Sequence, residues 1–122
     1  MQNVGVDLLK INRLKPLEGK WDDPFFKKAF TEKEIEFCLN HERPLVAFCE
    51  GFAAKEAVFK SLGMDGDSVR FDSIEILRNE IGQPTVTLLS PLDEKAKALG
   101  INRVALSLSY EEDAVIAFAI SE

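Results

Sequence analysis

The chain has 122 residues, of which 46% are hydrophobic and 30% are charged, and its formal net charge is −6. This length supports one domain with a hydrophobic core and is too short for two ordinary domains, so we expect a single domain over residues 1–122. The negative net charge argues against a general nucleic-acid-binding protein, and no apolar run is long enough to span a membrane.

The first third of the chain predicts one strand, one loop and one helix. Valines alternate with Gly5 and Asp7 in the segment 3–7, which is typical of a short strand. Asp7 ends this strand, where it is either the N-cap of a helix or a functional carboxylate. Proline and glycine predict a loop over residues 15–23, and a capping box predicts the start of a helix over residues 31–39.

A long helix is predicted from Pro44 to Leu62, because no proline interrupts the segment, alanines are frequent and a glycine follows it. On a helical projection the segment is apolar nearly all round, which is typical of a central, buried helix. Glu56 falls within the main apolar face, with Lys60 one turn further on at its edge and Lys55 on the other side. A carboxylate in that position is costly unless a cation meets it.

Two interpretations of Glu56 and Lys60 are open at this point. In the first, the two side chains form an ordinary i,i+4 pair on a solvated helix face, worth about 0.3–0.5 kcal/mol. In the second, Glu56 binds a hard metal ion and Lys60 binds an anion beside it. The small amount of solvated surface expected on this helix favours the second interpretation.

The second half of the chain predicts four strands and one helix. The strands cover residues 71–77, 85–89, 103–110 and 114–120, and the turn Gly82-Gln83-Pro84 precedes the second of them. A helix is predicted over residues 90–99, closed by a glycine. This mixed order of elements predicts an α+β fold, with a mainly antiparallel sheet packed on the long central helix.

Basic residues concentrate between residues 10 and 33, although the chain as a whole is acidic. They are Lys10, Arg13, Lys15, Lys20, Lys27, Lys28 and Lys33. This basic flank is either a set of solvated side chains or a surface that binds an acidic partner. Cys38 and Cys49 have neither metal-site nor disulfide spacing, and no signal peptide is present, so we expect buried thiols in a cytoplasmic protein.

Three segments, in order along the chain, together resemble the holo-acyl-carrier-protein synthase type of 4′-phosphopantetheinyl transferase. They are Val4-Gly5-Val6-Asp7 with Arg13 beyond it, Phe52-Ala53-Ala54-Lys55-Glu56-Ala57 with Lys60 and Gly63 following, and Ser107-Leu108-Ser109. The shorter segments 30–34 and 82–84 also fit the family pattern. The resemblance runs nearly end to end, and it implies a 4′-phosphopantetheinyl transferase-like domain.

The resemblance implies an enzyme that transfers the 4′-phosphopantetheine arm of coenzyme A to a serine of an apo acyl carrier protein, in fatty acid biosynthesis. Adenosine 3′,5′-bisphosphate is released. Asp7 and Glu56 are the implied ligands of Mg²⁺, which proteins usually hold through one or two carboxylates plus substrate phosphates. Glu56 and Lys60 are the implied catalytic residues, with Lys60 neutralising the diphosphate. The serine proton goes either to Glu56 or to a metal-bound water, and the residues do not distinguish the two.

The resemblance also implies the binding surfaces and the assembly. The implied coenzyme A residues are Lys55, Lys60, Gly63, Gly82, Gln83, Pro84, Ser107 and Tyr110. The carrier protein is expected on Arg13, Lys27 and Lys28, within the basic flank. The family commonly forms homotrimers with the coenzyme A cleft between subunits, and neither nucleic acid nor a membrane is an expected partner.

Four positions depart from the family pattern. Tyr110 and Ala105 stand where the family usually has histidines, Gly51 where it has an arginine, and Gln83 where it has a lysine. Each substitution removes a group expected near the phosphates or the nucleotide of the coenzyme. The alternative to an active transferase is therefore a degenerate, non-catalytic module that binds coenzyme A or a carrier protein.

Overall fold

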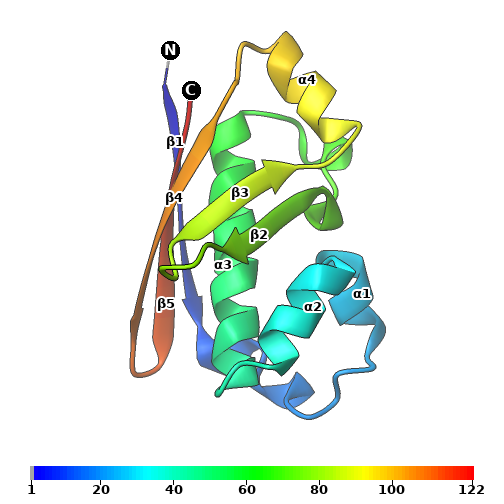
Figure 1. The fold of residues 1–122 in the computed structure, drawn as a ribbon, viewed down its shortest axis with the longest axis vertical. Coiled ribbons are helices and arrows are strands. Elements are labelled where there is room, and N and C mark those ends of the chain that lie inside the picture. The colour runs from blue at the N-terminus through cyan, green and yellow to red at the C-terminus, as the bar shows by residue number, and fades with distance from the viewer. Residues whose placement is uncertain (1) are drawn as a thin grey trace.

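The computed structural model describes residues 2–122, which form an α+β fold as expected (Figure 1). The elements in chain order are β1 (Asn3–Lys10), α1 (Pro24–Ala29), α2 (Glu32–Leu39), α3 (Pro44–Leu62), β2 (Ile74–Arg78), β3 (Pro84–Leu88), α4 (Leu92–Ala98), β4 (Val104–Glu111) and β5 (Ala114–Ser121). Short 3₁₀ turns lie between β1 and α1 and before β2.

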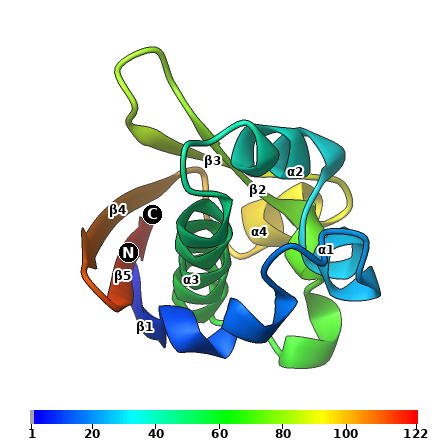
Figure 2. The same ribbon diagram turned by 90° about the horizontal axis from the view of Figure 1, so that it is seen from below.

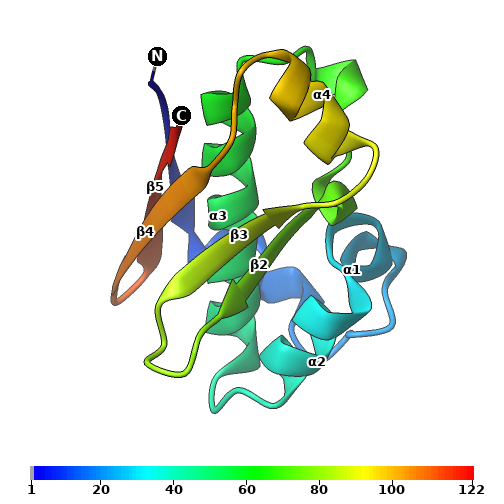
Figure 3. The ribbon, with the colours of Figure 1, turned by 45° about the horizontal axis from the view of Figure 1, so that its top comes forward.

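The strands form two separate antiparallel sheets. The first has the order β1-β5-β4, and in it Asp7 lies opposite Ala117. The second is the β2–β3 hairpin, which pairs with no other strand in residues 2–122. Figure 3 shows this hairpin lying across α3, next to β4. The predicted antiparallel arrangement of the strands is confirmed, but their division into two sheets was not predicted.

Helix α3 is the centre of the fold. Figure 2 looks along its axis and shows the three-stranded sheet on one side and the hairpin with α2 on the other. Twelve of its nineteen residues are buried, among them Phe48, Ala53 and Val58, so the prediction of a central helix is confirmed. Gly63 ends the helix in the left-handed conformation, with φ 66°.

Strand β1 lies against α3 because Gly5 has no side chain. A Cβ at this position would come within 2.0 Å of the Ala57 carbonyl oxygen and 2.7 Å of the Ser61 backbone nitrogen. Close by, on the neighbouring strand β5, the Ser121 hydroxyl donates a 2.7 Å hydrogen bond to the Ser61 carbonyl. These contacts fix the height of β1 along the helix, and with it the position of the next inward-facing residue, Asp7.

The opposite side of α3 is held by a buried ion pair, which we call the inner ion pair. Lys55 Nζ lies 2.7 Å from Glu34 Oε1 of α2, and the two side chains are 0% and 3% exposed. Lys55 also donates to the carbonyls of Phe71 and Ile74, while Glu34 accepts from the Ile76 nitrogen at 2.7 Å. The inner ion pair therefore joins α2, α3 and the start of β2.

Three local expectations differ from the structure. Strand β1 extends to Lys10, so Asp7 lies within a strand and is not an N-cap. Helix α1 directly follows the predicted loop, in a segment for which no helix was predicted; Asp23 caps it by accepting from Phe25, and Pro24 is its first residue. Residues 71–73 form a 3₁₀ turn, so β2 begins only at Ile74.

The remaining expected elements are confirmed to within a few residues. The capping box of α2 is present, with the Thr31 hydroxyl and the Glu34 carboxylate each accepting from the other's backbone N–H. Cys38 and Cys49 are buried free thiols, and burial raises the pKa of each to about 12. None of the helices in residues 2–122 has the length and apolarity that a bilayer crossing requires.

Candidate functional site

Three charged side chains meet where β1 crosses the second half of α3, and we call this group the carboxylate site. They are Asp7 of β1 and Glu56 and Lys60 of α3. Lys60 Nζ lies 3.3 Å from Asp7 Oδ1 and donates a 3.0 Å hydrogen bond to the Val6 carbonyl. The Asp7 side chain is 16% exposed and that of Lys60 is 50% exposed, so the group is open to solvent on one side.

The electrostatics of Glu56 show that it belongs to the same group. Burial, and next the negative charge of Asp7, raise the pKa of Glu56, whereas the positive charges of Lys60 and Arg13 lower it. Glu56 is half-buried, not enclosed in an apolar face as the helical projection predicted. Lys60 pairs with Asp7 on the neighbouring strand, so the interpretation as a simple i,i+4 surface pair does not describe this lysine.

The carboxylate site fits a magnesium ion of the kind that a substrate helps to hold. Two carboxylates that repel each other are stabilised by a cation between them. Residues 2–122 contain no group of three or more His, Cys, Asp or Glu side chains that would enclose a metal by themselves. Magnesium is commonly bound by one or two carboxylates with substrate phosphates and water completing its shell. The donor set of Asp7 and Glu56 matches that pattern.

Lys55 is not a coenzyme-binding residue in this structure, and the expectation drawn from the resemblance is corrected here. Its ammonium group has three N–H donors, and they are directed at Glu34 and at the carbonyls of Phe71 and Ile74. The side chain is 0% exposed, and its Nζ lies 5.4 Å from the ring centre of Phe30. A ligand has no access to it, so Lys55 stabilises the fold.

The remaining expected coenzyme residues lie apart from the carboxylate site. Gly63 lies three residues after Lys60, at the end of α3, but the turn Gly82-Gln83-Pro84 and Ser107 lie on the side of β4. Because β5 separates β1 from β4, Ser107 and Asp7 lie on opposite edge strands of the three-stranded sheet, and the turn belongs to the separate β2–β3 hairpin. Ser107 also faces outward, whereas Asp7 faces α3. A single chain therefore does not bring all the expected coenzyme-binding residues together at one site.

Tyr110 lies at the far end of β4, next to the start of α3. Arg43 donates a 2.8 Å hydrogen bond to its hydroxyl, and the guanidinium carbon lies 5.5 Å from its ring centre. The hydroxyl in turn donates to the Glu112 carbonyl at 3.2 Å. The positively charged guanidinium of Arg43 therefore lies beside Tyr110, which replaces the family histidine. The role of Tyr110 in coenzyme binding stays a prediction.

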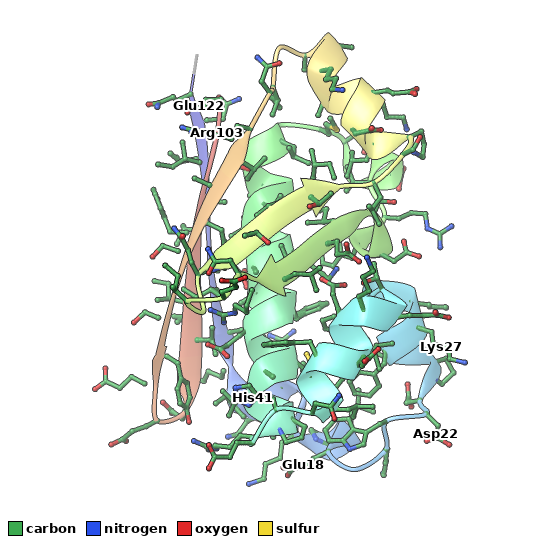
Figure 4. All side chains as sticks on the ribbon, in the orientation of Figure 1. Glu18, Asp22, Lys27, His41, Arg103 and Glu122 are labelled. Atoms are coloured by element: carbon green, nitrogen blue, oxygen red, sulfur yellow. The ribbon has the colours of Figure 1, made fainter. Side chains whose placement is uncertain are left out.

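The expected carrier-binding residues come from two elements. Arg13 ends a 3₁₀ turn after β1, and its charge acts on Glu56 of the carboxylate site. Lys27 and Lys28 lie in the last turn of α1. Figure 4 shows Lys27 pointing away from the body of the molecule, on the side opposite the three-stranded sheet. The basic flank is thus at the surface, as both interpretations of it require.

Sequence reasoning did not identify Glu34, Arg43 or Arg78 as important residues. Glu34 was noted only as part of a capping box, and its partner Lys55 is 21 positions away, too far for any local pattern to connect them. Arg78 lies 3.5 Å from Glu50 and bonds to the Gly82 carbonyl. The available signal for Arg78 was its position shortly before the turn that the resemblance assigns to coenzyme binding.

Comparison with known proteins gives a consistent result over the whole chain. The family model described as the 4′-phosphopantetheinyl transferase superfamily matches residues 3–119. The holo-[acyl-carrier-protein] synthase of Chlamydia trachomatis serovar L2 is 37% identical over 123 residues, covering 100% of both chains. The crystal structure of holo-[acyl-carrier-protein] synthase from Neisseria meningitidis is 32% identical, with a TM-score of 0.88 over 98% of this chain and 97% of that one.

A third relative was solved with a ligand. The holo-[acyl-carrier-protein] synthase of Helicobacter pylori, in complex with coenzyme A, is 25% identical, with a TM-score of 0.83 over 98% of this chain and 99% of that one. The resemblance that the sequence motifs predicted is therefore confirmed from end to end: the chain belongs to the 4′-phosphopantetheinyl transferase superfamily.

Proposed function

We propose that the protein transfers the 4′-phosphopantetheine arm of coenzyme A to a serine of an apo acyl carrier protein, and that residues 1–122 act as one domain. The serine oxygen forms a bond to the phosphorus that carries the pantetheine. The bond from that phosphorus to the bridging oxygen breaks, and adenosine 3′,5′-bisphosphate leaves. The observation that carries this proposal is the carboxylate site within a chain that matches named holo-[acyl-carrier-protein] synthases over its full length.

The chain's own residues have distinct roles in this reaction. Lys60 is half-exposed and lies beside the carboxylates, so it can pair with the diphosphate and with the charge that the leaving phosphate gains. Glu56 is the candidate proton acceptor for the serine, because burial and Asp7 raise its pKa. Asp7 orients Lys60 through their ion pair until a substrate phosphate takes that place.

Magnesium is the proposed cofactor, held by Asp7 and Glu56. When bound, the ion neutralises the diphosphate oxygens and stabilises the charge that develops on them. Support comes from the pair of carboxylates, since burial, and next the negative charge of Asp7, raise the pKa of Glu56. The position of Asp7 depends on the close approach of β1 to α3 at Gly5, so the site is built into the fold rather than into a mobile loop.

A homotrimer is the proposed assembly. The outward face of β1 and β5 exposes large apolar side chains, between 42% and 66% exposed, which are Val4, Val6, Leu8, Ile116 and Phe118. An apolar patch of this kind is typical of a protein–protein interface. A second copy seated there also offers a way to bring the residues at the β4 edge of one chain near the carboxylate site of the next.

The carrier protein is the proposed partner of the basic flank, and the reaction serves fatty acid biosynthesis in the cytoplasm. Arg13 supports this placement, since it is a member of the basic flank and its charge acts on Glu56. The unpaired thiols Cys38 and Cys49 suit a reducing compartment. Carrier binding should weaken steeply with salt if the contact is electrostatic, and Lys27→Glu with Lys28→Glu should weaken it further.

The test of the proposed function is a transfer assay. Purified protein is mixed with coenzyme A, Mg²⁺ and a panel of apo carrier proteins, and the carriers are weighed by mass spectrometry. We expect one carrier to gain the mass of one phosphopantetheine, and EDTA to abolish the gain. Binding of coenzyme A or of a carrier without any mass gain would instead support the non-catalytic alternative, which the departures at Gly51, Gln83, Ala105 and Tyr110 keep open.

A further inference from the structure

We propose that Arg78 is a positioning residue that holds the turn of residues 79–83 against α3, and that this turn binds coenzyme A only when so held. The inference rests on the proposed function, because it assigns a role to a residue that supports one part of the proposed coenzyme site. It differs from that function in concerning a residue outside the expected site set.

The turn needs an anchor because, although β3 packs beside β4, no backbone hydrogen bond in residues 2–122 joins this end of the hairpin to another element. The β2–β3 hairpin pairs with no further strand in the described part of the chain. The contacts of the inner ion pair hold the hairpin at its start, through Ile74 and Ile76. The turn lies at the opposite end, and Figure 2 shows it projecting beyond the helices.

Arg78 is the link between this turn and α3. One guanidinium nitrogen donates a 3.0 Å hydrogen bond to the Gly82 carbonyl, and another lies 3.5 Å from Glu50 Oε2. The Arg78 and Glu50 side chains are only 24% and 19% exposed, whereas Arg70, which pairs with Asp72 before the same hairpin, is 78% exposed. Partly buried ion pairs are screened less by solvent and salt than exposed ones.

The turn itself is a closed unit, so one anchor is sufficient to place it. The Asn79 side chain accepts from the backbone nitrogens of Ile81 and Gln83, at 3.1 and 2.9 Å. It also donates to the side-chain oxygen of Gln83 at 3.2 Å. Since these bonds make residues 79–83 move together, the bond to the Gly82 carbonyl fixes the orientation of the Gln83 side chain as well.

The position next to Glu50 on α3 has no side chain. Gly51 follows Glu50 directly, and together with Arg78 it lines a cavity of about 20 Å³. A Cβ at Gly51 would lie 3.1 Å from the Phe30 ring, which already fills the other side. Arg78 thus reaches α3 from β2 beside the position where the family pattern places an arginine on α3 itself.

The experiment measures KM for coenzyme A, kcat and backbone amide hydrogen exchange in four proteins. They are the wild type, Arg78→Met, Glu50→Gln and the matched control Arg70→Met. We expect Arg78→Met to raise KM about tenfold with kcat within about twofold, because the released turn must be ordered on binding. The amides of Asn79, Ile81, Gly82 and Gln83 should exchange faster, and Arg70→Met should change none of these quantities.

Glu50→Gln separates a positioning role from direct contact with a phosphate. If Arg78 positions the turn, losing its partner raises KM. If Arg78 binds a phosphate itself, removing the competing carboxylate lowers KM, and that result overturns the inference. Arg78→Lys keeps the positive charge but lacks the forked N–H donors, so it should raise KM as well. This variant replaces Arg78→Met in the experiment if Arg78→Met does not fold.

The remaining outcomes distinguish this inference from the proposed function. A wild-type protein that modifies a carrier, together with an Arg78→Met variant of unchanged KM, leaves the proposed function intact and overturns the inference. A wild-type protein that neither binds coenzyme A nor modifies a carrier removes the proposed function, and the coenzyme role of the turn with it. In that case the exchange rates show only whether Arg78 anchors the turn.

Discussion

Two lysines on α3, five residues apart, have opposite surroundings. Lys55 is 0% exposed and is surrounded by Glu34 and two backbone carbonyls, whereas Lys60 is 50% exposed and is bound on one side only, by Asp7 and the Val6 carbonyl. Because the N–H donors of Lys55 are all used within the fold, the inner ion pair cannot bind a ligand. The carboxylate site is open to solvent on one side and can bind one. One side of α3 therefore stabilises the fold, and the other side carries the residues of the proposed reaction.

The first prediction concerns the inner ion pair and carries the largest effect on stability. Lys55→Met should lower the free energy of unfolding by about 3–5 kcal/mol, because it leaves the Glu34 carboxylate buried without its cation. Lys60→Met should change it by less than about 0.5 kcal/mol. Urea denaturation of both variants measures the difference.

A double variant sharpens this prediction. Burial already raises the pKa of Glu34 and lowers the pKa of Lys55, against the opposing effect of each partner's charge. Glu34→Gln combined with Lys55→Met removes both charges and should recover part of the lost stability. Equal effects of Lys55→Met and Lys60→Met would contradict the division of roles between the two lysines.

The second prediction concerns Lys60 and activity. Lys60→Ala should lower kcat about a hundredfold, about 2.7 kcal/mol in the barrier, because it removes a cation from the charge that develops on the phosphates. KM for coenzyme A should rise by a smaller factor. Steady-state kinetics measure both. An equal loss in coenzyme affinity would reduce Lys60 to a binding residue.

The third prediction concerns the contact that places Asp7. Gly5→Ala adds a Cβ that would come within 2.0 Å of the Ala57 carbonyl, so β1 has to move away from α3. We expect a loss of about 1–3 kcal/mol in unfolding free energy, as for an overpacked core. Activity should fall more than the folded fraction does, because Asp7 moves with the strand. Circular dichroism and the transfer assay, compared on the same samples, measure this.

The fourth prediction concerns pH and has the smallest effect. Because the pKa of Glu56 is raised above its unfolded value of 4.5, the native state binds more protons than the unfolded chain in the window above pH 4.5. This contribution to stability is fully present below pH 4.5 and is lost as the pH rises through the folded pKa. Glu56→Gln should therefore gain stability relative to the wild type at pH 7, but not at pH 3.5.

This comparison is made by urea denaturation of both proteins in EDTA, so that bound metal does not contribute. Asp7→Asn is the matched control: burial and the charge of Asp7 raise the pKa of Glu56, and this substitution removes the second of these causes. It should reduce the difference between the two pH values. A Glu56→Gln variant that is less stable than the wild type at pH 7 would contradict the placement of Glu56 beside Asp7.

The sequence predicted those features that short patterns encode. The capping box at Thr31, the long helix ending at Gly63 and the alternating strands depend on residues within one or two turns of each other. Helix α1 was missed although Asp23 and Pro24 are a usual helix start, because the segment is only six residues long. The closeness of Asp7 to Glu56 of α3 followed from the family resemblance, which implies that both are magnesium ligands, whereas the strand order was not predicted.

The features that the sequence did not predict depend on distant partners. A helical projection placed Glu56 within an apolar face and Lys55 at its side, but it cannot show which other elements pack there. The structure brings Glu34 to Lys55 and leaves Glu56 half-buried beside Asp7. The links from Arg43 to Tyr110 and from Arg78 to Glu50 likewise join residues that are 67 and 28 positions apart.

The most direct test of the central claim is the transfer assay applied to Glu56→Gln. The wild type and the variant are incubated with coenzyme A, Mg²⁺ and the apo carrier protein that the wild type modifies, and the mass of the carrier is followed. We expect the wild type to add one phosphopantetheine, and the variant to add none while melting at or above the wild-type temperature. A folded Glu56→Gln protein that modified the carrier at the wild-type rate would contradict the assignment of the chemistry to the carboxylate site.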